Sequence, residues 1–404
     1  MRKLSLGRLK VLSDEVLYRS QLNSGYEFWN LKYLIFPVII YISFSCQERI
    51  TEQDNQVIGY LVDTVFINSK DRILDLRGNL LHLTLNDERK SFFLLNHFDL
   101  SIDEIDLDRQ EFVKSYPLEP EGPYGIGNYI ISLQSINDSL FFTKSNLGSS
   151  LFYKNGHLLK RIVWEGARDS NGKELTQFNR QNEVLSGTED LKVFGVDSNY
   201  KKGEVFMDVL SVKENRVKRF DIDPENSFHD FILRWDDNIF PPVVDLSLDK
   251  NFIRISHEFS NEIILFNPEG EFVKVVKYVP QKTPNRVKDP GGLEIRSRDQ
   301  AGKDYQRILE QVRFESPVWD NVKNRYLRLS SKRKYTDTYI DGNFVPEIKE
   351  TMVFLSIFDA EFNLISEMEI DELNDERVKY FAKDGKFWVC QNISDELGFL
   401  VFDL

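Results

Sequence analysis

Two groups of polar residues in the middle of the chain are of the types that bind metal ions. The groups are His257 and Glu258 with Asn261, and Asp236 with Asp237 directly after Trp235. A hard cation such as Ca²⁺ takes about six to eight oxygen ligands, so ligands from several loops would have to converge on it. Such a site would start a metal-assisted hydrolase or lyase mechanism. The competing interpretation is that the aspartates form an ordinary turn and that His257 is a packed core or rim histidine.

A surplus of positive charge marks a candidate binding surface in a chain whose formal net charge is −13. Residues 280–313 hold eight Lys and Arg, Arg307 among them, against five Asp and Glu, and Lys332, Arg333 and Lys334 follow in the next expected loop. Arginine donates forked hydrogen bonds to carboxylates and sulfates, which predicts recognition of an anionic glycan or of an envelope protein with an acidic surface. The competing interpretation is a pair of solvated loops in which Asp and Glu offset the basic side chains.

A glycine-rich segment, EGPYGIG at Glu121–Gly127, is the third candidate. It matches neither GxGxxG nor a Walker loop and lies between expected strands, so its glycines are expected to permit positive φ in a tight connection. Glu121 and Tyr124 within it are candidates for the mouth of a binding site. No serine stands in a GxSxG elbow. We therefore predict no catalytic residue and no cofactor, with Ca²⁺ as the one alternative.

The composition limits the class of protein. The 404 residues are 41% hydrophobic and 29% charged, as in a globular chain. Because phosphate binding requires a clustered positive surface, the negative net charge argues against nucleic acid as a partner. Two cysteines, Cys46 and Cys390, exclude a disulfide scaffold and a four-cysteine zinc site. Cys390, in the apolar run FWVCQN, is expected to be a small buried hydrophobic residue.

An apolar run near the N-terminus predicts export. Residues 33–45 contain no charge and are followed at once by Cys46. The run is shorter than the about 20 residues of a spanning helix and fits the hydrophobic region of a signal peptide. Its end resembles the lipobox of bacterial lipoproteins, which implies that Cys46 is acylated and becomes the first residue of the mature chain. The competing interpretation is a short buried strand or helix with an incidental cysteine.

The resemblance to lipoproteins divides the chain into three parts. Residues 1–45 are a signal peptide with an over-extended N-terminus, because a long segment stands before the apolar run. Residues 46–56 are a lipidated tether, and residues 57–404 are the folded domain. In such lipoproteins an Asp after the cysteine retains the protein in the inner membrane. Gln47 stands there instead, so the resemblance implies a lipid anchor in the outer membrane of the cell envelope.

Short β runs separated by Asn, Asp and Gly fill the chain after residue 56. They recur as units of three strands, each preceded by a further short strand. The units span 91–118, 139–164, 191–222, 251–279 and 325–370, and the last, 386–404, stops one strand short. Four-stranded units repeated in this way are typical of a β-propeller. A strand at 57–68 that belongs to no unit would complete the last one and leave no free edge.

This count predicts an all-β fold, a six-bladed β-propeller closed by pairing of the N-terminal strand with the last blade. A seven-bladed propeller is the alternative count, and a pair of β-sandwiches is the alternative architecture. One helix is expected, at 302–314.

Several of these features together resemble one group of proteins. The lipobox, the six units, EGPYGIG and the segment WDNVKNRYLRL at 319–329 resemble Bacteroidetes-type lipoproteins with a TolB-like six-bladed β-propeller. The resemblance covers residues 57–404, and one branch of these proteins is a family of unknown function. It implies the propeller and the lipid anchor, and it assigns no catalytic residue.

The long connections of such a propeller would lie on one face. Crossings between blades share that face with the turns between the second and third strands, and the irregular segments 119–128, 224–242, 280–313 and 331–349 belong to these two classes. Binding residues gather on loops of this kind. We therefore predict a membrane-anchored, non-enzymatic protein that binds a ligand or partner with this face. The alternative is a metal-assisted hydrolase or lyase at the central mouth, where the carboxylates named above would converge.

Overall fold

The computed structural model describes most of the chain after residue 58. The described residues are 59–77, 83–176, 180–187, 190–223, 228–249, 251–288, 291–340, 342–374 and 377–404. All of them belong to the compact unit Gln53–Leu404. The predicted signal peptide, Cys46 and the tether lie outside the described residues.

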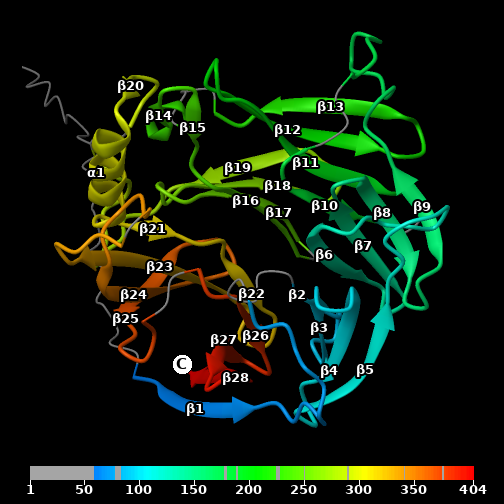
Figure 1. Cartoon of the computed structure of the whole chain (residues 1–404), viewed down its shortest axis with the longest axis horizontal. Coiled ribbons are helices and arrows are strands. Elements are labelled where there is room, and N and C mark those ends of the chain that lie inside the picture. Colours follow the sequence, from blue (N-terminus) through cyan, green and yellow to red (C-terminus); the bar gives the residue numbers. More distant parts are fainter. Residues whose placement is uncertain are drawn as a thin grey trace, which may run out of the picture. The chain divides into compact units, whose positions relative to one another are not determined.

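The described residues form six main sheets that follow one another along the chain (Figure 1). Sheet 1 consists of β2 (Leu83–Leu85), β3 (Ser91–Asn96), β4 (Ser101–Asp106) and β5 (Glu111–Pro117). Sheet 2 consists of β6 (Ile130–Ile136), β7 (Leu140–Ser145), β8 (Gly148–Tyr153) and β9 (Leu158–Ile162). Sheet 3 consists of β10 (Glu183–Ser186), β11 (Lys192–Asn199), β12 (Glu204–Ser211) and β13 (Arg216–Asp221). Sheet 4 consists of β16 (Val244–Leu248), β17 (Ile253–His257), β18 (Ile263–Phe266) and β19 (Phe272–Val276). Sheet 5 consists of β21 (Arg313–Phe314), β22 (Val318–Asp320), β23 (Arg325–Tyr335), β24 (Ile348–Phe358) and β25 (Leu364–Glu369). Within each sheet the strands pair antiparallel, mostly in chain order, with β21 and β22 both pairing with β23.

Sheet 6 combines the two ends of the described chain. It consists of β26 (Tyr380–Lys383), β27 (Lys386–Ile393), β28 (Glu396–Asp403) and β1 (Leu61–Phe66). β1 pairs antiparallel with β28, from Leu61 opposite Asp403 to Phe66 opposite Gly398. The strand predicted at 57–68 is therefore the outermost strand of the last sheet.

Hydrophobic cores lie between neighbouring sheets. In β3, Phe93 packs edge-on against Phe141 of sheet 2, with 5.0 Å between ring centroids, and Phe92 packs against Phe399 of sheet 6 at 5.6 Å. Adjacent residues of a strand point to opposite faces, so sheet 1 is buried on both sides. Buried clusters of this kind join each sheet to the next, and one joins sheet 6 back to sheet 1. The order of these cores is therefore cyclic.

Polar turns reverse the chain between strands, as the Asn, Asp and Gly pattern predicts. Asp249 holds the turn from β16 to β17, because its Oδ1 accepts from the backbone N–H groups of Asn251 (2.8 Å) and Phe252 (3.0 Å). Asp320 does the same in sheet 5 for Val322 (3.1 Å) and Lys323 (3.2 Å). A side chain that satisfies two backbone donors stabilises a tight reversal without help from a neighbouring sheet.

Two long connections fold together into a small module. β14 (Leu233–Trp235) and β15 (Asn238–Phe240) form a hairpin after the 3₁₀ turn His229–Phe231, and β20 (Ile295–Arg296) pairs parallel with β14. α1 (Arg298–Leu309) follows β20 and contributes Ile308 and Leu309 to a separate core with Leu233. Apart from the 3₁₀ turn and α1, the regular secondary structure of the described residues is all-β.

The helix differs from its predicted range of 302–314. Ser297 Oγ accepts from the backbone N–H of Gln300 (3.3 Å), so a capping residue starts the helix at Arg298. Arg313 and Phe314 pair with Ser331 and Ser330 as β21. The helix therefore begins four residues before the predicted start and ends at Leu309.

Candidate functional site

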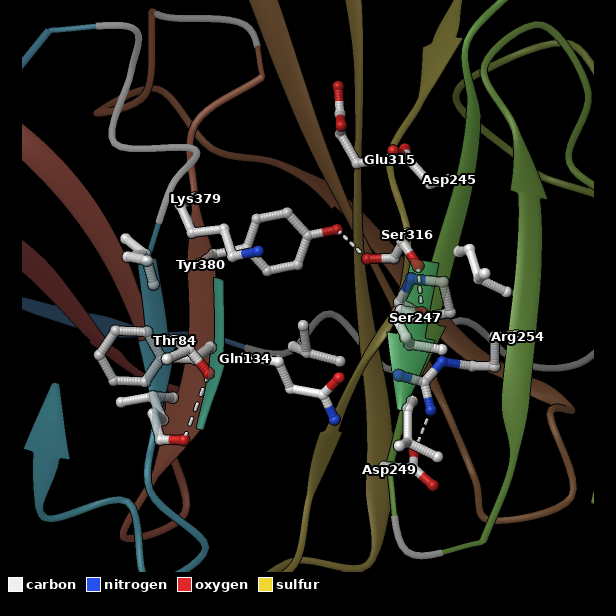
Figure 2. Close-up of a pocket in the computed structure, with 18 of the residues that line it drawn as sticks. Thr84, Gln134, Asp245, Ser247, Asp249, Arg254, Glu315, Ser316, Lys379 and Tyr380 are labelled. Atoms are coloured by element: carbon white, nitrogen blue, oxygen red, sulfur yellow. Dashed lines mark hydrogen bonds and ion pairs between the residues drawn. The ribbon is translucent and has the colours of Figure 1, made fainter. Parts of the chain in front are cut away.

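A central pocket of about 420 Å³ is lined by residues from all six main sheets (Figure 2). Its lining is made of 83–85, 132–134, 182–184, 245–249, 315–319 and 377–382, with Arg89 and Arg254. These segments are, or directly adjoin, the innermost strand of each sheet. A cavity of this size suits a small organic ligand.

Side-chain hydrogen bonds join neighbouring innermost strands around the pocket. Between sheets 1 and 2, the backbone N–H of Ser135 donates to Thr84 Oγ1 (3.1 Å). Between sheets 2 and 3, Gln134 donates to the carbonyl of Leu185 and accepts from its N–H, both at 2.9 Å. The pairs at the other four junctions are Asn182 with Val244, Ser247 with Ser316, Tyr380 with Ser316, and Arg89 with Ala382. These polar groups hold the six strands in register, so the shape of the pocket is fixed before a ligand arrives.

Glu315 is a polar side chain of the pocket that does not take part in these hydrogen bonds. Its Oε1 is shielded from solvent and has no hydrogen-bond partner among the described residues. Burial raises the pKa of the Glu315 carboxyl to about 7, and the negative charge of Asp245 adds to the shift. Asp245 itself lies 4.0 Å from Arg377. Figure 2 shows Glu315 and Asp245 at one end of the pocket and Asp249 with Arg254 at the other.

Stability above neutral pH tests the state of Glu315. A folded pKa near 7 lies above the ordinary value of 4.5, so the folded state holds the proton more tightly than the unfolded state. The stabilisation by this proton is complete below pH 4.5 and is lost as the pH rises through 7. Glu315→Gln, which cannot ionise, is therefore expected to be more stable than the natural protein by about 2–3 kcal/mol at pH 8, with little of that gain at pH 5. Urea unfolding of both proteins at the two pH values measures this, with exposed Asp237→Asn as the control. An equal difference at pH 5 and pH 8 would contradict the assignment.

The opposite end of the pocket is built on an ion pair. Arg254 binds Asp249, and both side chains are largely buried. The Arg254 guanidinium also lies 5.7 Å from the ring centre of Tyr326. Arg89 reaches the same region, and burial lowers its pKa. This end therefore presents cationic groups that belong to the scaffold.

The structure separates the two predicted metal-binding groups from each other. His257 and Glu258 are buried at the end of β17, whereas Asp236 and Asp237 lie on the exposed turn between β14 and β15. Among the described residues, no three His, Cys, Asp or Glu side chains are placed to hold a metal ion together. Trp235 packs against Phe344 with 4.8 Å between ring centroids, so it belongs to the module around α1.

His257 is a packed core residue. Its Nδ1 accepts from the backbone N–H of Phe259 (2.9 Å), and its ring lies 4.3 Å from that of Phe228 and 4.9 Å from that of Phe231. Burial lowers its pKa to about 3. Glu258 is held by Arg313, through Nε at 2.8 Å and Nη2 at 2.7 Å. The Glu258–Arg313 pair therefore links sheets 4 and 5, whereas His257 packs against the connection that precedes sheet 4.

The predicted basic loop is partly a strand. Lys332, Arg333 and Lys334 lie in β23, which continues to Tyr335, so their placement in a loop is wrong. Lys332 Nζ donates to the carbonyl of Lys282 (3.0 Å), and Lys334 pairs with Glu350 (2.8 Å). Arg333 is buried and donates to the hydroxyl of Tyr335 (3.1 Å). The strand continues because these side chains pair across and along it.

The remaining basic residues near α1 are divided between core and surface. Arg307 is exposed on the helix and pairs with Asp304. Arg313 is buried, as described above. The exposed basic side chains of the 280–313 segment are Lys282, Arg286, Lys288, Arg298, Lys303 and Arg307. The positive surface is thus smaller than the sequence suggests.

The EGPYGIG segment connects β5 to β6, with its first four residues exposed and Gly125–Gly127 buried. Gly122 and Gly127 have φ of +89° and +96°, which confirms the predicted need for glycine. Glu121 is exposed, and Tyr124, 46% exposed, lies over His157 with 5.0 Å between ring centroids. Neither residue lines the central pocket.

Known proteins place the chain in a family. A family model with the description "Domain of unknown function (DUF4221)" matches residues 56–369, which is most of the chain. The chain belongs to the DUF4221 family. The predicted resemblance to a family of unknown function is confirmed at this level. No curated protein matches the chain.

Solved structures resemble this DUF4221 protein in fold. A DUF4221 family member from Bacteroides vulgatus has a TM-score of 0.58 and 11% identity, over 87% of this chain and 99% of the other. A protein of Bacteroides fragilis named as exported has a TM-score of 0.48 and 9% identity, over 86% and 97% of the two chains. The WD40 domain of a Toxoplasma gondii coronin has a TM-score of 0.38 and 9% identity, over 86% and 77%. WD40 domains are β-propellers.

A site at a central mouth was the alternative prediction from the sequence, but the residues that line the pocket of this DUF4221 protein were not predicted. In sheets 4, 5 and 6, Asp245 is the second residue of β16, Glu315 lies between β21 and β22, and Arg377 stands three residues before β26. Among the described residues, no helix has the length and apolar character needed to cross a membrane. The buried state of Cys390 is as predicted.

Proposed function

We propose that this DUF4221 protein is a lipid-anchored binding protein of the cell envelope. Each of the six main sheets is one blade of a β-propeller, and β1 closes the ring by completing the last blade. The protein holds a small ligand in the central pocket, without catalysing a reaction. The observation that carries the proposal is the pocket itself, to which every main sheet contributes and whose polar side chains are mostly engaged with the scaffold.

The ligand enters from the face with the long connections. A crossing brings the chain from the outermost strand of one blade to the start of the next innermost strand. Asp245 is the second residue of β16, Glu315 directly follows the short β21, and Arg377 stands three residues before β26, so the crossings lie around this end of the pocket. The longest crossing contains α1, with exposed Arg298 and Lys303. This basic rim favours an anionic glycan or an acidic envelope protein as a further partner.

Thermal unfolding of the full chain with a ligand panel tests the pocket. The panel contains small amines, alcohols and carboxylates, acidic and neutral glycans, and Ca²⁺ with and without chelator. A ligand at about 100 times its Kd stabilises the protein by about 2.7 kcal/mol, which shifts the transition measurably. Ser132 is small and lines the pocket, so Ser132→Trp fills it and Ser132→Ala is the matched control. We expect at least one compound to stabilise the natural protein and Ser132→Ala, and to leave Ser132→Trp unchanged. Stabilisation that survives in Ser132→Trp would overturn the pocket as the binding site.

Fatty-acid labelling tests the anchor. In cells fed an alkynyl fatty acid, we expect the natural protein to be labelled and to sediment with membranes, and Cys46→Ser to lose both properties. Cys390→Ser is the matched control and keeps the label, because Cys390 is buried in the core between sheets 6 and 1. Labelling of Cys46→Ser at the natural level would overturn the lipid anchor and leave the pocket proposal standing.

A further inference from the structure

The end of the pocket that holds Glu315 and Asp245 contains a carboxylate, that of Glu315, with no hydrogen-bond donor for its buried oxygen in the described part of the chain. No hydrogen bond to the Glu315 carboxylate occurs among the described residues, and its Oε1 is shielded from solvent. Asp245 is the negative group that acts most strongly on Glu315, and its own ion pair with Arg377 is loose at 4.0 Å. A buried carboxylate without a partner costs free energy unless it is protonated or meets a cation.

Among the described residues, no group of a neighbouring strand donates a hydrogen bond to Glu315 Oε1. Arg313 donates to Glu258 from two nitrogens, at 2.8 and 2.7 Å. Tyr380 donates its hydroxyl proton to the carbonyl of Ser316 (2.6 Å). The charged and titratable groups around the carboxylate are Asp245 of β16, Glu258 after β17, Arg313 of β21, Arg328 of β23, and Arg377, Lys379 and Tyr380 at β26. A cationic group of a ligand could therefore bind beside Glu315, next to the carboxylates of Glu315 and Asp245.

We infer that this end of the pocket binds an organic cation, a ligand with an ammonium or guanidinium head and an apolar body. The head donates to Glu315 and Asp245, and the body lies along the apolar wall that includes Leu246, Val318 and Val378. The inference names the ligand class of the pocket and so rests on the proposed function.

An ammonium group fits these residues better than a metal ion does. Ca²⁺ requires about six to eight oxygens, whereas an ammonium is satisfied by about three acceptors. Two carboxylates meet here, and the serine hydroxyls next to them, Ser247 and Ser316, already bond each other at 2.8 Å. The apolar wall adds affinity for an organic body and none for a bare ion.

Three compounds with one body and different heads test the inference. Phenethylamine, 2-phenylethanol and phenylacetate are titrated into the full chain at pH 8 by ligand-observed NMR. We expect the amine to bind at least tenfold more tightly than the alcohol and the carboxylate. Glu315→Gln is expected to remove that tenfold preference and to leave alcohol binding unchanged. Exposed Asp237→Asn is the matched control and keeps the natural affinities. Lowering the pH from 8 to 6 is expected to weaken amine binding to the natural protein several-fold, because Glu315 takes up its proton.

The outcomes separate the inference from the proposed function. If all three compounds bind equally and Ser132→Trp abolishes their binding, the pocket is a ligand site and the cation inference is overturned. If the amine does not bind, or binds Glu315→Gln as well as the natural protein, the inference is overturned as well. If no compound of this or the wider panel depends on Ser132, both proposals fail. Equal thermal stability of Glu315→Gln and the natural protein at pH 5 confirms that the variant is folded.

Discussion

Asp208→Ala is expected to lower the free energy of unfolding by about 3–5 kcal/mol, the cost of breaking a buried ion pair by removing one partner. Asp208 is fully buried in β12 and binds two arginines. Its Oδ2 accepts from Arg180 Nε at 2.7 Å, and its Oδ1 accepts from Arg219 Nε at 2.8 Å. Arg180 is itself fully buried, with its guanidinium 4.7 Å from the ring centre of Trp164. Removal of the carboxylate takes away the counter-charge that these two arginines share, and urea unfolding measures the loss.

Asp197 provides the matched control for this prediction. It pairs with the same Arg219 at the edge of the network, where the arginine side chain is 40% exposed. Asp197→Ala is therefore expected to cost less than about 1 kcal/mol. If Asp208→Ala does not fold, Asp208→Asn gives an intermediate loss that can still be compared with Asp197→Ala. Equal losses for positions 208 and 197 would show that burial of the ion pair does not decide its contribution.

Acid is expected to destabilise the protein through His257. Its pKa in the folded state, about 3, lies below the ordinary value of 6.5. Between these two pH values the histidine is protonated in the unfolded state and neutral in the folded state. This contribution to stability is complete above pH 6.5 and is lost as the pH falls toward 3. Between pH 6.5 and 4.5 the loss from this one residue amounts to about 2–3 kcal/mol. The measurement is urea unfolding at half-unit pH intervals.

Two variants isolate the histidine from the carboxylates that titrate in the same range. His257→Phe keeps a ring beside Phe228 and Phe231 but cannot be protonated. It is less stable at neutral pH, because the N–H of Phe259 loses its acceptor, and its stability falls less steeply below pH 6.5. His157→Phe, at an exposed position, is expected to keep the natural slope. Parallel slopes for the natural protein and His257→Phe would refute the assignment.

The repeating strands were predictable because each strand and each turn is marked by its own residues. β3 has consecutive phenylalanines because both faces of its sheet are buried, and Asp249 and Asp320 mark turns through bonds to their own backbone. These signals depend on residues close together in the chain. The last sheet was harder to predict, since β1 pairs with β28 across almost the whole described chain. Its prediction depended on the count of strands.

The errors arose where distant residues decide the local structure. Lys332, Arg333 and Lys334 were expected in a loop because three consecutive charged residues are typical of a solvent-exposed segment. In the structure they belong to β23 and pair with β24. Gly195 gave no sequence signal, although a Cβ there would lie 2.6 Å from the Cβ of Arg180, whose side chain crosses β11 to reach Asp208.

The pocket was missed for the same reason. Glu315 and Asp245 are 70 positions apart, and only the cyclic order of the sheets brings them to one end of the cavity. A single carboxylate at the start of a strand has no neighbour in the sequence that marks it as functional. Pairs such as Asp236 and Asp237 attracted attention through adjacency, and the structure places them on an exposed turn.

The fluorescence of Trp319 during ligand titration tests the central claim most directly. Trp319 lines the pocket on the segment that also carries Glu315, so a ligand held there changes the surroundings of its indole. We predict that phenethylamine, and each panel compound that stabilises the protein, shifts the emission with the same Kd as the stabilisation. Trp319→Phe is expected to lose the shift and to retain the stabilisation. A stabilising ligand that leaves the emission of Trp319 unchanged, or a shift that persists in Trp319→Phe, would contradict binding in the central pocket.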